Sequence, residues 1–286
     1  MPRRYRLKGV GTVSSALVEI PMAATDLCSE TKLAAGAKAE DTGDALVPRV
    51  AVVVPVLNEA ENIRPLIDEI AAALLDQGPY EIVFVDDGSS DATQERLSEA
   101  ALQMRQLRCV RHPRRAGQSA AIVSGVKAAR GSIIVTLDGD GQNDPADIPK
   151  LLDVIRRDSD PVRLLVTGLR AKRRDTWVKR VSSRVANGVR SRLLKDATPD
   201  TGCGLKVFMR EAFLDMPRFD HMHRFLPALM VRQGGRVVSV PVHHRPRQRG
   251  QSNYGTLDRL WVGLVDLAGV MWLQRRARLT ATEPDR

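Results

Sequence analysis

The sequence predicts an α/β fold in which helices flank a mostly parallel β-sheet. From residue 49 onward, short apolar and β-branched runs alternate with longer helical patterns. The first run, RVAVVVPV, is apolar at consecutive positions, as expected for a strand that helices cover on both faces. Strands that alternate with helices in this way are typical of parallel sheets.

The alternation continues to about residue 168. In the first helical segment, Asn58 is placed to cap the N-terminus and Gly78 follows the C-terminus. We expect strands over residues 49–56, 80–87, 107–112, 131–138 and 162–168. We expect helices over residues 58–78, 89–104, 117–130 and 144–158.

The second half of the chain has a different character. Residues 170–195 are very basic, and apolar residues recur near every fourth position, which predicts an amphipathic helix with a basic outer face. That face is either solvated or binds an anionic surface. A short strand within 198–213, a helix over 223–235 and a strand over 236–244 are expected next. Residues 256–278 predict an amphipathic C-terminal helix that either packs on the domain or lies in a membrane interface.

Composition limits the size, partners and compartment of the protein. The 286 residues suffice for one large α/β domain, and the formal charge of +10 favours anionic partners. Three cysteines far apart fit a reducing, cytosolic setting, and no apolar run is long enough for a membrane-spanning helix. We expect a disordered segment at 1–48 rather than a cleaved signal peptide, a folded domain at 49–255, and a helix with a basic tail at 256–286.

Acidic and amide side chains follow three of the expected strands, in the stretches PVLNE, VDDGSSD and LDGDGQND. The carboxyl ends of parallel strands meet at one edge of a sheet, where ligands bind. Asp138 and Asp140 flank Gly139, and positions i and i+2 of an extended chain point to the same side. Two carboxylates with room for water suit Mg²⁺ or Mn²⁺ bound together with a substrate diphosphate. Asp86 and Asp87 could accept hydrogen bonds from a base or a ribose.

These stretches also have other interpretations. Three unrelated polar loops would give similar letters. Neither GxxxxGK[ST] nor GxGxxG follows a strand, which argues against a P-loop NTPase and a dinucleotide dehydrogenase. A nucleic-acid-binding protein that uses the basic helix at 170–195 is a remote alternative. We expect no nucleic-acid partner, because aromatic residues make up only 4% and no recognition motif occurs.

Four stretches taken together, PVLNEAENI, VDDGSSDAT, LDGDGQNDP and RQRGQSNYG, resemble family-2 inverting glycosyltransferases with the A-type fold, a Rossmann-like, mostly parallel sheet flanked by helices. The sequence is most similar to the polyprenyl-phosphate sugar transferases, of which dolichol-phosphate mannosyltransferase is typical. The resemblance covers about residues 50–254 and, more loosely, the chain to residue 278. Residues 49–255 would then be the glycosyltransferase domain.

The resemblance implies which residues bind the donor. A nucleotide-diphosphate sugar would lie against residues that follow the first, second and fourth strands. These residues are Pro55, Asn58, Glu59, Asp86, Asp87, Asp138 and Gln142. The Mg²⁺ or Mn²⁺ ligands would be Asp138 and Asp140, with Gln142 beside them.

The resemblance also implies which residues bind phosphate and act in catalysis. Arg170 and the loop residues Arg247, Gly250 and Ser252 would hold the donor diphosphate and the acceptor phosphate. Asp140 would act through the metal. Asp200 matches a family position near the acceptor and would be a base, although a lipid phosphate is already ionised near neutral pH.

The loop departs from the family pattern at one position. The family usually has lysine after the serine, whereas this chain has Asn253. Arg245 or Arg249 would then substitute for the missing cation. The QxxRW signature of processive synthases is absent, which favours transfer of a single sugar.

The implied function is the transfer of one sugar to an undecaprenyl or dolichyl phosphate, with inversion and with help from the metal, in cell envelope glycan synthesis. A glycosyltransferase with a glycan or protein acceptor is the alternative. The enzyme would be a cytoplasmic protein, peripheral on the cytoplasmic face of the membrane, where its basic segments meet an anionic surface. A membrane partner protein is a further partner that the sequence leaves open.

Overall fold

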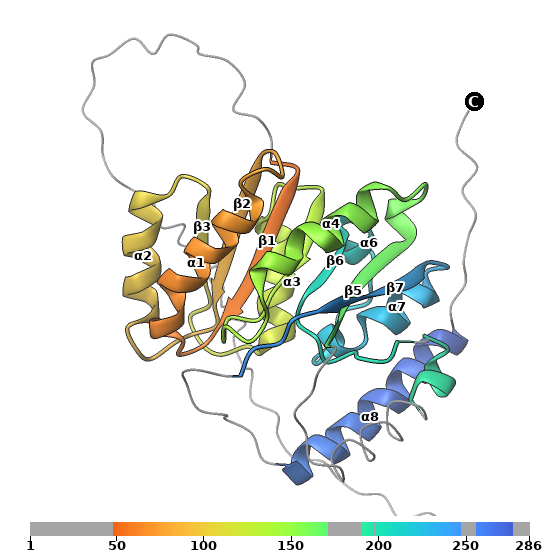
Figure 1. The fold of residues 1–286 in the computed structure, drawn as a ribbon. Coiled ribbons are helices and arrows are strands. Elements are labelled where there is room, and N and C mark those ends of the chain that lie inside the picture. The colour runs from red at the N-terminus through yellow and green to blue at the C-terminus, as the bar shows by residue number, and fades with distance from the viewer. Residues whose placement is uncertain (1–47, 171–189, 197, 247–255, 277–286) are drawn as a thin grey trace, which may run out of the picture. The chain divides into compact units, whose positions relative to one another are not determined.

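The computed structural model describes residues 48–170, 190–196, 198–246 and 256–276. A sheet at its centre is formed by β1 (Val50–Val56), β2 (Tyr80–Asp86), β3 (Leu107–Arg111), β4 (Ile133–Thr136), β5 (Leu164–Arg170), β6 (Lys206–Met209) and β7 (Arg236–Val242). Within the described ranges, the strand order is β3-β2-β1-β4-β6-β5-β7. Every neighbouring pair is parallel except those of β6, which is antiparallel to β4 and to β5 (Figure 1). The prediction of a mostly parallel α/β sheet is confirmed.

Helices cover both faces of this sheet (Figure 1). One hydrophobic cluster joins the sheet to α1 (Ala60–Leu74), α2 (Thr93–Gln103) and α4 (Ile148–Arg156). A second cluster joins it to α3 (Gln118–Ala128), α6 (Arg210–Leu214) and α7 (Leu226–Arg232). The short helix α6 was not among the predicted elements. The other helices begin and end within a few residues of the predicted ones, and a separate 3₁₀ turn precedes α4.

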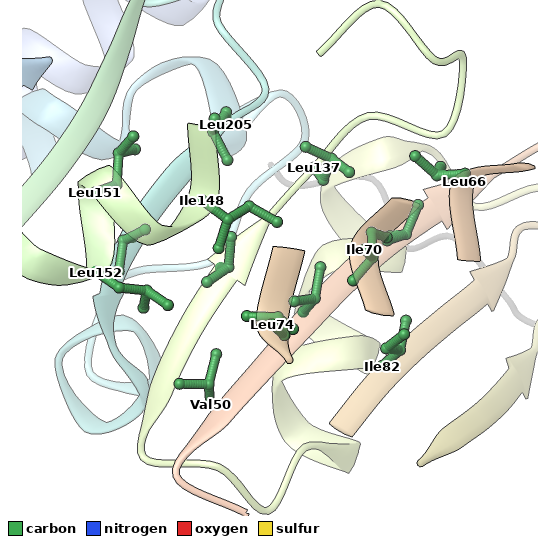
Figure 2. Packing of buried hydrophobic residues seen from close by; sticks show 14 of the residues in the cluster. Val50, Leu66, Ile70, Leu74, Ile82, Leu137, Ile148, Leu151, Leu152 and Leu205 are labelled. Atoms are coloured by element: carbon green, nitrogen blue, oxygen red, sulfur yellow. The ribbon is translucent and has the colours of Figure 1, made fainter. Parts of the chain in front are cut away.

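The apolar run of β1 is explained by burial on both faces. Val52 and Val54 belong to the cluster beneath α1 and α4, whereas Ala51 and Val53 belong to the cluster on the α3 side. All four are completely buried. Figure 2 shows the first cluster, in which Ile70 and Leu74 of α1 and Leu151 and Leu152 of α4 contribute side chains to the packing over the sheet.

The start of α1 differs from the expectation. The prediction that Asn58 caps this helix is wrong, because Glu59 occupies the N-cap position. Asn58 has a left-handed backbone with φ of 57°, and its side-chain Oδ1 accepts a hydrogen bond from Ser90 N at 2.8 Å. The loop after β1 is therefore tied to the loop after β2 rather than to its own helix.

The C-terminal segment forms α8 (Thr256–Arg275). Leu267, Val270 and Met271 pack in a small apolar cluster with side chains that include Leu194 and Phe225. Elsewhere on α8, Val265 is 56% exposed and Trp272 is 60% exposed. None of the helices in the described segments is long and apolar enough to cross a membrane. The predictions for residues 1–47, 171–189 and 277–286 lie outside the described residues.

Candidate active site

The acidic stretches after β1, β2 and β4 meet at one edge of the sheet, because these strands are parallel neighbours. Val56 of β1 is in register with Asp86 of β2, and Asp138 lies two residues beyond the end of β4. Gly139 packs directly on β1, since a Cβ there would lie 2.5 Å from Val56 Cγ1 and 2.9 Å from the Pro55 carbonyl oxygen. This turn can approach β1 only with glycine at its centre.

A cavity of about 160 Å³ opens beside Asp138. In this measure one water molecule needs only roughly 10–15 Å³, so the cavity is large enough for a ligand group rather than for a single solvent molecule. Its walls come from the ends of β1 and β4, the start of α3, the segment before β6, and the turn before α7. Polar side chains on these walls include Gln118, Asp138, Thr201, Lys206, His223 and Arg224.

The Asp138 carboxyl is in an environment that disfavours its negative charge. Burial raises its pKa and Asp140 raises it further, while Lys206 and Arg170 act in the opposite direction. Gln118 Nε2 donates a hydrogen bond to Asp138 Oδ1 at 2.9 Å. A buried carboxylate beside another one is stabilised by a cation between them.

Two carboxylates fit a Mg²⁺ or Mn²⁺ ion better than a structural metal such as zinc. No group of three or more His, Cys, Asp or Glu side chains that could hold a metal occurs among the described residues. Magnesium sites of nucleotide enzymes commonly use one or two carboxylates and complete their shell with water and substrate phosphates. Asp138 and Asp140 provide such a set. Gln142 shapes the turn, because its backbone N–H donates to Asp140 Oδ1 at 3.1 Å.

The carboxylate of Asp87 has a different set of partners. It accepts hydrogen bonds from Ala116 N, Gly117 N and His112 Nδ1, each at 2.8 Å, and it is only 4% exposed. These contacts attach the loop before α3 to the end of β2. Asp86 is fully buried, and its Oδ1 accepts from Ser89 N at 2.9 Å.

One oxygen of this acidic pair still lacks a hydrogen-bond donor. Asp86 Oδ2 is buried without a hydrogen bond, with Arg111 Nε 3.8 Å away. Of Asp86 and Asp87, it is therefore Asp86 that has a carboxylate oxygen able to accept a further hydrogen bond. The predicted contact of Asp87 with a nucleotide stays a prediction, and it would compete with three donors of the protein.

The other residues predicted to bind the nucleotide sugar are Pro55, Asn58 and Glu59, and they lie at the end of β1 and in the loop that follows it. Pro55 lines the cavity. The backbone N–H of Asn58 donates to Ser89 Oγ, and that of Glu59 donates to Thr93 Oγ1, both at 2.9 Å. These bonds give the loop after β1 a fixed path beside the acidic edge.

Arg170 and Asp200 form a buried pair. Arg170 Nε and one terminal nitrogen donate to the two carboxylate oxygens of Asp200, each at 2.7 Å. This pairing raises the pKa of Arg170. Because both of its oxygens bind the guanidinium, Asp200 is better placed to orient Arg170 than to accept a proton, so the structure does not favour its predicted role as a base.

Several side chains at the cavity were missed by sequence reasoning, and Lys206 and His223 are the most deeply placed of them. Lys206 lies in β6, is 4% exposed, and its Nζ donates to the Cys203 carbonyl oxygen. Burial lowers the pKa of Lys206, and Cys203, Asp138 and other nearby groups oppose that shift. A lysine inside the apolar run LKVF was a signal that could have pointed to it.

The sequence gives no such signal for His223. Its Nδ1 lies 2.7 Å from Ser119 Oγ at the start of α3. Burial lowers the pKa of His223 to about 3, so its ring is neutral at physiological pH. The ring forms an uncharged part of the cavity wall.

The loop predicted to bind phosphate is described only at its start. The predicted residues Arg247, Gly250 and Ser252 lie outside the described residues. Arg245 N donates to the Gln142 carbonyl oxygen at 2.9 Å, so the loop begins beside the turn of Asp138 and Asp140.

Arg245 has two carboxylate partners of its own. Its guanidinium donates to Glu69 Oε2 at 2.7 Å and to Asp144 Oδ1 at 2.8 Å. Because these two carboxylates neutralise its charge, the structure does not favour Arg245 as the substitute for the missing phosphate-binding lysine. Arg249, the other candidate, lies outside the described residues.

Residues 51–216 match the family described as glycosyl transferase family 2. The chain is 35% identical to a dodecaprenyl-phosphate galacturonate synthase of Rhizobium johnstonii, over 79% of this chain and 67% of that protein. It is also 35% identical to an undecaprenyl-phosphate 4-deoxy-4-formamido-L-arabinose transferase of Edwardsiella ictaluri, over 73% of this chain and 63% of that protein. The chain thus spans about two thirds of the length of these relatives.

Solved structures share the fold at lower identity. Glucosyl-3-phosphoglycerate synthase from Mycobacterium tuberculosis, in complex with Mn²⁺ and UDP-glucose, matches with a TM-score of 0.59 and 21% identity, over 82% of this chain and 81% of that one. A mannosyltransferase from Pyrobaculum calidifontis, in complex with GDP-mannose and Mn²⁺, matches with a TM-score of 0.57 and 23% identity, over 83% and 67%. The chain belongs to glycosyltransferase family 2, and its domain has the A-type glycosyltransferase fold.

Proposed function

We propose that this protein transfers a single sugar from a nucleotide-diphosphate sugar to a polyprenyl phosphate, with inversion at the anomeric carbon. The observation that carries the proposal is the cavity of about 160 Å³ that opens beside Asp138, next to the Asp138 and Asp140 carboxylates. The two relatives named above are polyprenyl-phosphate sugar transferases by name, and they support the choice of acceptor.

Asp138 and Asp140 would hold the divalent ion, Mg²⁺ or Mn²⁺. When bound, such an ion neutralises the charge that develops on the departing diphosphate. Gln118 fixes one oxygen of Asp138, and the backbone of Gln142 fixes one oxygen of Asp140. The protein therefore presents both carboxylates in a set orientation before the donor arrives, which lowers the cost of reorganisation.

The acceptor needs positioning more than it needs a base. A polyprenyl phosphate is already ionised near neutral pH, so its oxygen can attack the anomeric carbon directly. The attack comes from the side opposite the leaving diphosphate and inverts the configuration. Asp200 would keep Arg170 in place near the reacting phosphates, and Arg247, Gly250 and Ser252 stay our proposed ligands of the acceptor phosphate.

A location at a membrane surface is part of the proposal. Val265 and Trp272 of α8 expose apolar surface, and Arg275 and Arg276 are exposed at its end. The guanidinium of Arg276 lies 6.0 Å from the centre of the Trp272 ring. Tryptophan beside arginine is typical of helices at an anionic membrane interface, and this supports peripheral binding on the cytoplasmic face.

A donor screen tests the function. The full chain is incubated with Mn²⁺ or Mg²⁺, a polyprenyl phosphate in detergent, and each common UDP-, GDP- or dTDP-sugar, and the lipid is analysed by mass spectrometry. We expect one new lipid mass that is lost with a chelator. Donor hydrolysis or binding without a lipid product would move the acceptor to a glycan or a protein. Failure to bind any nucleotide sugar would refute the proposal.

A further inference from the structure

The cavity beside Asp138 has a cation whose charge the described residues do not balance. Arg224, in the 3₁₀ turn Met222–Arg224, lines the cavity and is exposed. It makes no ion pair or side-chain hydrogen bond with any residue that the structure describes. The other cations are engaged, since Arg170 binds Asp200 and Lys206 donates to the Cys203 carbonyl oxygen.

A second arginine adds to the positive charge near Arg224. Arg190, in a helical segment at residues 190–194, donates to Asp196 Oδ1 at 2.9 Å. Its Nε and Nη1 atoms are buried without a hydrogen bond. Burial lowers the pKa of Arg190, Asp196 opposes this effect, and the nearby charge of Arg224 adds to it. Among the described residues, Asp196 pairs with Arg190, and no carboxylate forms an ion pair with Arg224.

An oxyanion would complete this arrangement. Guanidinium groups bind carboxylate and phosphate oxygens through paired hydrogen bonds, and these charge-assisted bonds are among the strongest in proteins. His223, the neighbour of Arg224, does not supply the charge, because burial keeps its ring neutral. The carboxylate of Asp138 faces Lys206, Gln118 and the proposed metal instead.

The position of Arg224 indicates which oxyanion it would meet. A sugar attached to a diphosphate beside Asp138 would enter the same cavity that Arg224 lines. The loop proposed for the acceptor phosphate begins elsewhere, where Arg245 N bonds to the Gln142 carbonyl oxygen and its guanidinium bonds to Asp144. Neither Gln142 nor Asp144 is among the cavity-lining residues.

We infer that the cavity selects donors whose sugar carries a carboxylate, and that Arg224 binds that carboxylate. The substrate class would be nucleotide-diphosphate hexuronates. This inference rests on the proposed function as far as the nucleotide-sugar donor is concerned, but it does not depend on the acceptor.

Binding of matched donors tests the inference without an acceptor. The full chain with Mn²⁺ is titrated calorimetrically with UDP-glucuronate and UDP-glucose, UDP-galacturonate and UDP-galactose, and GDP-mannuronate and GDP-mannose. The members of each pair differ only in a carboxylate or a hydroxymethyl group. For at least one pair, we expect the hexuronate to bind about 10- to 100-fold more tightly, the range of a hydrogen bond to a charged group.

Two variants of Arg224 and one control variant test whether Arg224 causes the preference for the hexuronate. Arg224→Gln should remove it by weakening hexuronate binding about 10- to 100-fold, with the neutral donor unchanged. Arg224→Lys should keep part of it, because the charge remains. Arg130 is an exposed arginine before β4, on the other edge of the sheet, and Arg130→Gln should leave every affinity unchanged.

Several outcomes would overturn the inference. Equal or tighter binding of the neutral donor in every pair would do so, and so would the absence of nucleotide-sugar binding. A preference that survives in Arg224→Gln would place the carboxylate elsewhere. If Arg224→Gln instead raised the KM for polyprenyl phosphate and left donor affinities unchanged, Arg224 would be an acceptor ligand. If the protein preferred the hexuronate but formed no lipid product, this inference would be supported and the proposed lipid acceptor would be refuted. Failure of the inference can therefore be distinguished from failure of the proposed function.

Discussion

The acidic residues after β2 and those after β4 look alike in the sequence but lie in opposite surroundings. Three donors of the protein, among them two backbone N–H groups, bind the carboxylate of Asp87. Asp138 instead faces a cavity, with Asp140 raising its pKa and Gln118 as a hydrogen-bond donor. The first carboxylate is satisfied by the fold, whereas the second lies in the cavity wall, where we propose that it meets a ligand.

This difference teaches that an acidic residue at a strand end must be judged by the segment that lies across from it. The loop before α3 closes over β2 and supplies donors to Asp87. Across from Asp138 lies Gly204, where a Cβ would overlap the carboxylate group. One neighbour brings hydrogen-bond donors, and the other, which has no side chain, makes room for the carboxylate itself.

The largest expected effect is on activity, from Asp138→Asn. Sugar transfer should fall at least about 100-fold, because a charge that acts on the leaving group is lost. Stability should not fall. The folded state raises the pKa of Asp138, so its ionised form weakens folding at neutral pH, and a neutral amide removes that cost. Transfer rate and the Tm without metal are the two measurements, and a Tm loss as large as that of Asp87→Ala would contradict the comparison.

The next effect is on stability, from Asp87→Ala. Three buried donors would lose their acceptor, which should cost about 3 kcal/mol and lower Tm by roughly 6–12 °C. Thermal unfolding measures this change. Asp153→Ala is the matched control, since its pair with Arg157 is 3.7 Å long and well exposed, and less than about 1 kcal/mol is expected. Equal losses in the two variants would show that Asp87 is not a structural residue.

The smallest effect is a pH dependence set by His223. Its pKa is about 3 in the folded state, below its usual 6.5, so unfolded chains bind a proton that folded chains do not. Stability should therefore fall as the pH drops below about 6.5, by about 2 kcal/mol at pH 5.

Denaturant unfolding at pH 7 and pH 5 gives the size of this change. His223→Gln should flatten the profile, because the group that takes up the proton on unfolding is then absent. If the free energy of unfolding of His223→Gln fell with pH as steeply as that of the wild type, a group other than His223 would cause the pH dependence.

The sequence predicted the acidic edge because its cause is local. Asp138 and Asp140 follow a strand whose apolar pattern is continuous, and parallel neighbours bring such ends together. The partners of Asp87 could not be predicted in the same way. In the sequence, a helix and a strand separate His112 and Gly117 from Asp87. No rule of residue spacing predicts that these residues contact Asp87.

The cavity residues Lys206 and Arg224 could not be predicted from the sequence, because their position depends on the topology of the sheet. Lys206 comes beside Asp138 because β6 inserts between β4 and β5 in the antiparallel sense. An alternation of strands and helices indicates neighbours that follow each other, but it does not reveal an insertion of this kind. Arg224 depends on the same insertion, since its turn follows β6 and α6.

The insertion of β6 also has a consequence for biosynthesis. β4 and β5 leave the ribosome before β6, so until Lys206–Met209 has been made, each has an edge that waits for its neighbour. Unpaired edges of this kind are where nascent chains associate with each other, and domains generally fold as their chain emerges. The carboxylates can gather once about half of the chain exists, but the cavity has its full wall only after Leu226 has emerged. A truncated or stalled product would thus display the acidic edge without a place for a sugar.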